Sequence, residues 1–136
     1  MKVTIVLLSL IFGFLTACAS EPKVSADPDK YIFSDLEEVK IINNWKLHGW
    51  VEVDENSLIV RTTPKTSYLL ILTRPNYDLK RAQGIVVTTT AGSVEARFDS
   101  VSTLNKRGIR YPIARIYKLE EGKDQRNEIK ARILGE

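Results

Sequence analysis

The sequence feature that most constrains the fold is a series of short strand-like segments separated by turn residues. Trp45 to Asp54 alternates with the period of two that a half-buried β-strand requires. The turn Asp54-Glu55-Asn56 follows, and the segments 57–62 and 67–73 then flank Thr63-Pro64-Lys65, where proline favours a turn. These segments predict consecutive antiparallel strands. The apolar face of the first consists of Trp45, Leu47, Gly49, Val51 and Val53.

The run Tyr68-Leu69-Leu70-Ile71-Leu72 indicates where the core lies. No polar residue interrupts it, whereas a strand with one face in water alternates between apolar and polar residues. The run therefore predicts a central strand whose two faces are both covered.

A hairpin is predicted further along the chain. Ile85 to Thr90 is rich in β-branched residues, and Ala91-Gly92 forms a tight turn into Ser93 to Asp99. In the second of these strands, one face is expected to consist of Val94, Ala96 and Phe98.

The last strand-like run, Ile109 to Leu119, is irregular. Its apolar residues begin in strand phase and then slip, which predicts a bulge between Pro112 and Arg115. Proline at this point favours an edge strand.

About six short strands spaced by turns predict a mostly β fold, either a small antiparallel sandwich or a partly open barrel. One or two short helical turns are expected, one at the capping-box sequence Ser34-Asp35-Leu36-Glu37 and one at 78–83. Residues 120–136 are mostly charged and predict a frayed tail. The alternative for this tail is a last strand containing Ile129, Ala131 and Ile133.

Composition excludes several classes of function. A length of 136 residues fits one domain, and the formal net charge of +3 is too small for a protein that chiefly covers nucleic-acid phosphates. With one Cys, one His and one Met, the chain by itself builds no disulfide framework, cysteine zinc site or multi-histidine site. We therefore expect no metal, no cofactor and no nucleic-acid partner.

The N-terminus has the pattern of an export signal. Met1-Lys2 is a short basic start, and Val3 to Leu15 is uncharged. This run suits a signal peptide and is shorter than the ~20 residues that span a bilayer. It ends in Leu15-Thr16-Ala17-Cys18, which resembles the lipobox of bacterial lipoproteins. The sequence thus divides into a signal peptide (1–17), a lipidated Cys18 with a flexible tether (18–33), a β-rich domain (34–119) and the charged tail (120–136).

The lipobox resemblance implies that Cys18 becomes the lipidated N-terminus of the mature protein. Ala19 and Ser20 follow it, without the Asp that keeps Gram-negative lipoproteins in the inner membrane. The expected location is therefore the periplasmic face of the outer membrane. The alternative is a plain secretory signal, or an uncleaved anchor, in which Cys18 has no such role.

A second resemblance spans residues 39–119. The order of features resembles an uncharacterised family of small bacterial lipoproteins, a domain of unknown function. Members often carry extra cysteines, where this chain has Pro75-Asn76 and near Tyr111, and their absence here puts a redox role in doubt. The resemblance implies a fold and supplies no catalytic residues. It is carried by Trp45, Val53-Asp54, Leu58-Ile59-Val60, Tyr68-Leu69-Leu70, Leu79, Ile113 and Ile116.

One segment has an uneven charge. From residue 106 to 118 there are five basic residues and no acidic one, which suits binding to an anionic lipid, a glycan or an acidic partner protein. The five are Lys106, Arg107, Arg110, Arg115 and Lys118. The alternative is a solvated face that Glu95, Asp99, Glu120 and Glu121 neutralise across the fold.

The sequence favours a binding or structural role over catalysis. His48 is the only imidazole, and the alternation places it on the polar face beside Trp50. The carboxylates show no diagnostic spacing, and no GxSxG, P-loop or GxGxxG motif is present. Two alternatives stay open. One is an inhibitor or immunity-type lipoprotein that docks through Arg74–Asp78 or Ile109–Ala114, and the other is an envelope hydrolase that uses His48 with a carboxylate.

Overall fold

The computed structural model describes residues 28–135. The predicted signal peptide, Cys18 and most of the tether lie outside the described residues. The strands are β1 (Glu37–Val39), β2 (Ile41–Ile42), β3 (Gly49–Asp54), β4 (Ser57–Arg61), β5 (Ser67–Leu72), β6 (Ile85–Val87), β7 (Val94–Glu95), β8 (Ser100–Thr103) and β9 (Tyr111–Lys118). The helical segments are the 3-10 turns η1 (Pro28–Tyr31), η2 (Leu79–Arg81) and η3 (Leu104–Lys106), and the α-helix α1 (Arg126–Leu134).

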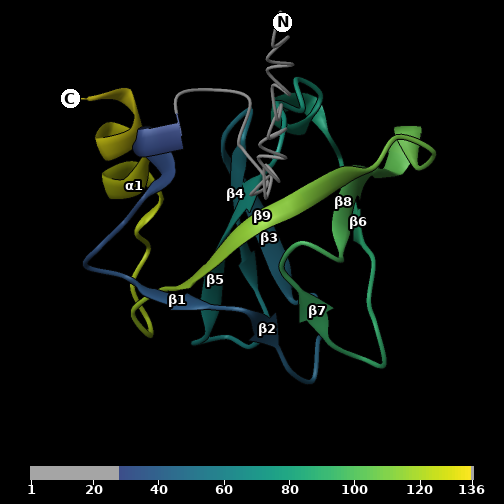
Figure 1. The fold of residues 1–136 in the computed structure, drawn as a ribbon, viewed down its shortest axis with the longest axis horizontal. Helices are drawn as coiled ribbons and strands as arrows, with labels where there is room; N and C mark the ends of the chain where they lie inside the picture. The colour runs from purple at the N-terminus through teal and green to yellow at the C-terminus, as the bar shows by residue number, and fades with distance from the viewer. Residues whose placement is uncertain (1–27, 136) are drawn as a thin grey trace, which may run out of the picture.

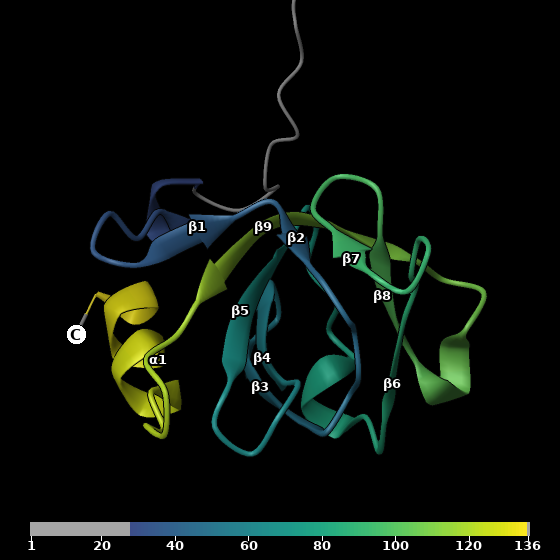
Figure 2. The same cartoon turned by 90° about the horizontal axis from the view of Figure 1, so that it is seen from below.

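Most strands join one antiparallel sheet that curls into an open half-barrel (Figures 1 and 2). The order across the sheet is β3-β4-β5-β9-β8-β6, and β1 pairs with β9 beside this path. The short β2 and β7 form a separate antiparallel pair. The predicted mostly β fold, with a partly open barrel and short helical turns, is confirmed.

β9 is the strand that joins the two halves of the sheet. It pairs with β5 along one edge, and its other edge pairs with β1 near Lys118 and with β8 near Tyr111. Its register with β5 shifts between Arg115 and Ile113, which confirms the predicted bulge. The expectation of an edge strand is wrong, because β9 is paired along both edges. Pro112 lies at the end of the β5 ladder, where its carbonyl still accepts from the Thr73 N–H at 2.9 Å and only the reciprocal bond is missing.

The sheet is buried on both faces at its centre. Leu69 and Ile71 of β5 lie in one hydrophobic cluster, which η1 and α1 cover from outside. Leu70 and Leu72 lie in the other cluster, which fills the inside of the curl. Because successive strand residues point to opposite faces, the uninterrupted apolar run is confirmed as a central strand covered on both sides.

The predicted frayed tail is instead an ordered end to the chain. Helix α1 buries Ile129 and Ile133, which are four residues apart and so share one helical face. Arg126 donates from Nε to the Glu52 carbonyl at 2.6 Å, which joins the helix start to β3. Gly135 ends the helix in the left-handed region at φ 75°. The helix was not predicted because this segment has few apolar residues. Their contribution to stability depends on packing against an apolar face of the sheet, which the local sequence does not show.

The predicted hairpin forms only at its turn. Ala91 and Gly92 adopt positive φ, and Thr90 and Ser93 exchange backbone hydrogen bonds of 2.8 and 3.0 Å. The two arms then separate, since β6 pairs with β8 while β7 pairs with β2. Arg97 at φ 76° breaks the predicted second strand. Phe98 is therefore 76% exposed rather than part of an apolar face.

Two other local expectations differ from the structure. Ser34-Asp35 forms a turn that leads directly into β1, so the capping-box sequence starts no helix. β3 begins at Gly49, and Val51 on it is 38% exposed while Trp50 packs on the inner cluster. Tertiary packing has overridden local pattern at both places. The helical turn expected at 78–83 is present as η2.

The role of α1 as a cover is testable by two alanine substitutions in the same helix. Ile129→Ala should lower the free energy of unfolding by about 2–4 kcal/mol, because it opens a cavity in the outer cluster. Leu134→Ala is the control, since its side chain is 55% exposed, and it should change stability by at most about 0.5 kcal/mol. Urea denaturation followed by circular dichroism measures both. Equal effects would contradict the packed helix.

Candidate functional site

Two loops at one end of the sheet form the candidate site, which we call the basic loop end and define as residues 74–83 and 104–110. The first loop joins β5 to β6 and contains η2, and the second joins β8 to β9 and contains η3. In Figure 1 the first loop lies at the upper centre and the second at the right. The basic loop end is thus assembled from segments more than twenty residues apart in sequence.

Direct contacts hold the two loops together. Lys106 forms an ion pair of 2.9 Å with Asp78, which raises the pKa of Lys106 through this hydrogen bond and its charge. Arg74 donates from Nη2 to the Arg110 carbonyl at 2.6 Å. The same guanidinium lies 4.4 Å from the centroid of the Tyr111 ring, a cation–π arrangement. The loops therefore present one continuous surface.

The charge of this surface is strongly one-sided. It holds six of the chain's 20 basic residues and one of its 17 acidic residues, so the remainder of the chain has more acidic than basic residues. All six basic residues are exposed, and the single acidic residue, Asp78, is paired with Lys106. The six are Arg74, Lys80, Arg81, Lys106, Arg107 and Arg110. Such a surface attracts anionic groups.

Apolar side chains project among these charges. Tyr77 is 77% exposed, and Leu104 and Ile109 are each 43% exposed. A polar solvent-facing loop has no need of an exposed aromatic ring, and clusters of exposed apolar groups mark contact surfaces. The basic loop end therefore combines charge with apolar groups that can be buried by a partner.

The structure divides the basic segment that the sequence analysis identified. Lys106, Arg107 and Arg110 lie in the basic loop end. Arg115 lies on β9 and forms an ion pair of 3.2 Å with Glu38 of β1. Lys118 lies at the far end of β9, opposite Glu37. A strand advances about 3.3 Å per residue, so a continuous basic run in sequence is spread along the molecule.

The sequence analysis did not group Arg74, Lys80 and Arg81 with the basic segment. Arg74 was named only as part of the alternative docking loop Arg74–Asp78, and the sequence signal of the other two is the single pair Lys80-Arg81 just after that loop. Their position next to η3 follows from the pairing of β5 with β9 and of β6 with β8. Pairings between distant strands cannot be read from local pattern.

A buried polar cluster around Asp54 supports the turn next to the basic loop end. The Tyr31 hydroxyl donates to Asp54 Oδ2 at 2.6 Å, and the Ser57 hydroxyl donates to Oδ1 at 2.5 Å. Burial raises the pKa of Tyr31 well above its usual value, and the hydrogen bond and charge of Asp54 add to this. The Asn76 N–H donates to the Glu55 carbonyl at 2.7 Å. Tyr31, near the start of the described chain and beside α1, is thereby linked to the turn next to the basic loop end.

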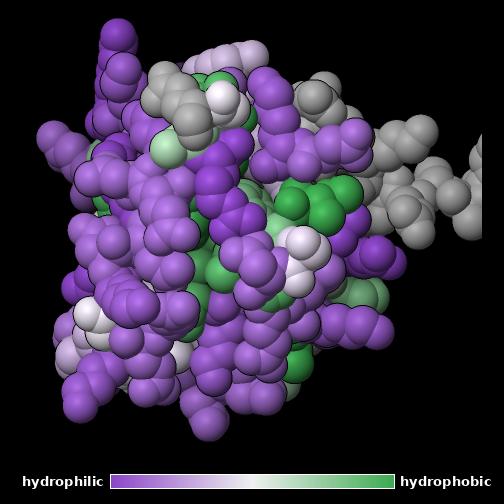
Figure 3. Space-filling view, turned by 90° about the vertical axis from the view of Figure 1, so that its left-hand side faces the viewer, coloured by the Kyte–Doolittle hydropathy of each residue, from purple (hydrophilic) through white to green (hydrophobic). Residues whose placement is uncertain are grey.

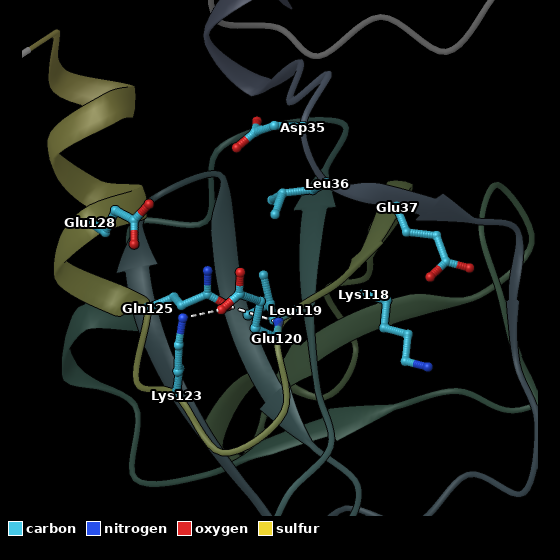
Figure 4. Close-up of a pocket in the computed structure, with 9 residues that line it drawn as sticks. All are labelled: Asp35, Leu36, Glu37, Lys118, Leu119, Glu120, Lys123, Gln125 and Glu128. Atoms are coloured by element: carbon cyan, nitrogen blue, oxygen red, sulfur yellow. Dashed lines mark hydrogen bonds and ion pairs between the residues drawn. The ribbon is translucent and has the colours of Figure 1, made fainter.

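A separate hollow lies between the segment before β1, the end of β9 and the start of α1 (Figure 4). Its volume is about 410 Å³. Asp35 is held by Arg132 at 2.6 Å, which lowers the pKa of Asp35, and Glu120 is paired with Lys123. Figure 3 shows that hydrophilic side chains cover most of the α1 side, with hydrophobic atoms in a narrow strip. Of the charged side chains of this hollow, Asp35 joins the segment before β1 to α1 through Arg132, and the Glu120–Lys123 pair lies within the loop before α1.

The remaining candidate residues are not gathered into a reactive cluster. His48 is exposed just before β3, and in residues 28–135 no hydrogen bond or ion pair joins its imidazole to a carboxylate. Asp99 is buried, and its carboxylate accepts from Thr88 Oγ1 and the Glu95 N–H at 2.8 Å each. Within the same residues, no group of three or more His, Cys, Asp or Glu side chains is placed to hold a metal ion. Nor is any helix there long and apolar enough to cross a bilayer.

Comparison with known families matches nearly the whole chain. A family described as being of unknown function, DUF6491, matches residues 1–135. The chain belongs to this family. The DUF6491 match includes α1 and the basic loop end as well as the sheet, and it confirms the predicted membership of a family without a known function. Searches of curated proteins and of solved structures found no match.

The Asp54 cluster makes the free energy of unfolding depend on pH in the alkaline range. Because the folded chain holds the Tyr31 proton to a higher pH than the unfolded chain, this contribution is complete below pH about 10 and declines above it. Tyr31→Phe should therefore flatten the fall in the free energy of unfolding above that pH. The exposed Tyr77→Phe is the matched control and should follow the wild type. Urea titrations across alkaline pH measure this, and identical profiles for both variants would contradict it.

Proposed function

We propose that this protein is a lipid-anchored component of the bacterial cell envelope, attached through Cys18 to the periplasmic face of the outer membrane. Its β-rich domain then serves as a non-catalytic binding or structural module. The observation that carries the proposal is Leu15-Thr16-Ala17-Cys18 at the end of an uncharged run. One sixteen-carbon acyl chain contributes roughly 12 kcal/mol to membrane binding, so two or three chains hold the protein permanently.

The arrangement of the described residues supports a binding role. The exposed His48 has no carboxylate partner among residues 28–135, and two carboxylates of the hollow beside α1 are held in ion pairs. The basic loop end instead offers exposed charge and apolar groups on loops fixed by a packed sheet. Binding residues commonly lie on such loops.

The anchor is tested by lipid labelling in a Gram-negative host. Wild-type chain should incorporate a palmitate analogue and sediment with membranes, and Cys18→Ala should lose the label completely, because the thioether can form only at Cys18. Ser20→Ala is the control for a change near the processing site, and it should label as the wild type does. Labelling of Cys18→Ala would contradict the proposal.

The sorting signal gives a second test. Ala19→Asp should move the lipidated protein from the outer-membrane fraction to the inner-membrane fraction of a sucrose gradient, because the sorting machinery reads the residue after the lipidated Cys. Ala19→Ser should stay in the outer-membrane fraction. An unchanged position of Ala19→Asp would overturn the outer-membrane assignment while leaving the anchor intact.

The second candidate function is an inhibitor or immunity-type lipoprotein, favoured by the exposure of Tyr77 in the Arg74–Asp78 loop. Affinity purification of the intact protein after brief cross-linking distinguishes the two. A stoichiometric protein partner that is lost in Cys18→Ala supports the inhibitor. Recovery of the chain alone supports a lipid, glycan or small-ligand target.

A further inference from the structure

We propose that the basic loop end docks on the anionic headgroups of the bilayer that carries the anchor, and that Tyr77 and Ile109 enter the headgroup layer. This inference rests on the proposed function, which places the protein at a bilayer. The docking surface itself is formed by residues that the structure describes. It gives the domain a defined orientation on the membrane, which a lipid tether alone does not provide.

The first step of the argument is charge complementarity. Six exposed basic side chains share one end of the molecule. Of the acidic side chains there, Asp78 is paired with Lys106, Glu52 is paired with Arg126 and Glu55 lines a hollow with Lys80, so basic charge remains in excess. The rest of the chain carries more acidic than basic residues, so an anionic surface attracts this end and repels the remainder. Basic side chains near an anionic bilayer each strengthen binding.

The second step is the kind of apolar group that the surface presents. Tyr77 is 77% exposed, and Ile109 lies between the exposed basic residues Arg107 and Arg110. Tyrosine favours the membrane interface, because its ring is apolar and its hydroxyl stays hydrated. Basic residues interleaved with exposed apolar ones are the composition of surfaces that lie on a bilayer.

The third step is where the chain enters the fold. Tyr31 is fixed by its 2.6 Å hydrogen bond to Asp54, and the adjoining Glu55 carbonyl accepts from the Asn76 N–H. Nine residues lie between Cys18 and Pro28, and a fully extended connection over these ten Cα–Cα steps reaches at most ~35 Å. The start of the described chain packs beside α1 and is connected by this hydrogen-bond path to the Asn76 loop of the basic loop end, so a tether attached there leaves this loop within reach of the bilayer.

The fourth step is the rigidity of the surface. Asn76 and Leu79 are buried, each 1% exposed, and the Asn76 side-chain carbonyl accepts from the Asp78 N–H at 3.1 Å. The contacts of Arg74 with Arg110 and of Lys106 with Asp78 then fix one loop against the other. The two loops are therefore held in place before binding, so docking costs little conformational entropy.

The experiment places a fluorescent label at single positions of the full, lipid-anchored chain. In that chain Cys18 is a thioether, so Tyr77→Cys or Ile109→Cys supplies the only free thiol. Lys65→Cys, in the exposed turn between β4 and β5, labels the opposite end. The protein is reconstituted into phosphatidylcholine vesicles with and without phosphatidylglycerol, and quenching by a lipid with a quencher on its upper acyl chain is measured.

Docking predicts severalfold stronger quenching at 77 and 109 than at 65, in the phosphatidylglycerol vesicles only. Added salt should reduce this difference, because screening weakens attraction between the charges and the surface. Arg107→Glu with Arg110→Glu should abolish it. Lys46→Glu with Lys65→Glu, tested with the labels at 77 and 109, makes the same change in net charge elsewhere and should leave quenching at those positions unchanged.

Failure of docking and failure of the anchor give different results. If all variants float with both kinds of vesicle but quenching is equal at 65, 77 and 109, the anchor stands and docking is overturned. If the chain floats with neither kind, both proposals fail. If it floats only with phosphatidylglycerol vesicles and the charge reversals at Arg107 and Arg110 prevent this, docking stands without the anchor.

Discussion

The burial of β5 and β9 on both faces is the constraint on which the other elements depend. These two strands pair at the centre of the sheet, and their alternating side chains enter two separate hydrophobic clusters. A sheet with two apolar faces is stable in water only when both are covered. Curling of the sheet covers the inner face, and η1 with α1 covers the outer one. Helix α1 is therefore stabilised mainly by packing on the outer apolar face of the sheet.

The same arrangement produces the basic loop end. β5 and β8 reach the same end of the sheet, because both pair antiparallel with β9, and their following loops emerge there together. The packed strands support residues that have no core role of their own, including Tyr77 and Arg107. The Asp54 cluster ties the start of the described chain to the neighbouring turn. The start of the described chain and the exposed surface therefore belong to one packed domain.

The sequence predicts the structure best where the pattern of buried residues is contained within a single strand. Two features could be predicted because the period of apolar residues along a strand depends directly on which side chains are buried. They are the central run Tyr68–Leu72 and the change of phase near Pro112. The hairpin at Ala91-Gly92 was predicted too long, because its turn is a local feature whereas the partners of its arms are not. Ile129 and Ile133 alone did not indicate a helix, because their burial depends on the sheet face against which they pack.

The sequence by itself determined the approximate positions of β3, β4, β5, β6 and β9, the central strand, the small number of cysteines and histidines, and the residues on which the anchor proposal stands. Each of these follows from local pattern or from the presence of a residue type. Only the tertiary structure decided which charges share a surface. It separated Arg115 and Lys118 from Lys106 and brought Arg74, Lys80 and Arg81 beside η3. The physical reason is that an extended strand carries neighbours in sequence apart, while strand pairing brings together loops that are distant in sequence.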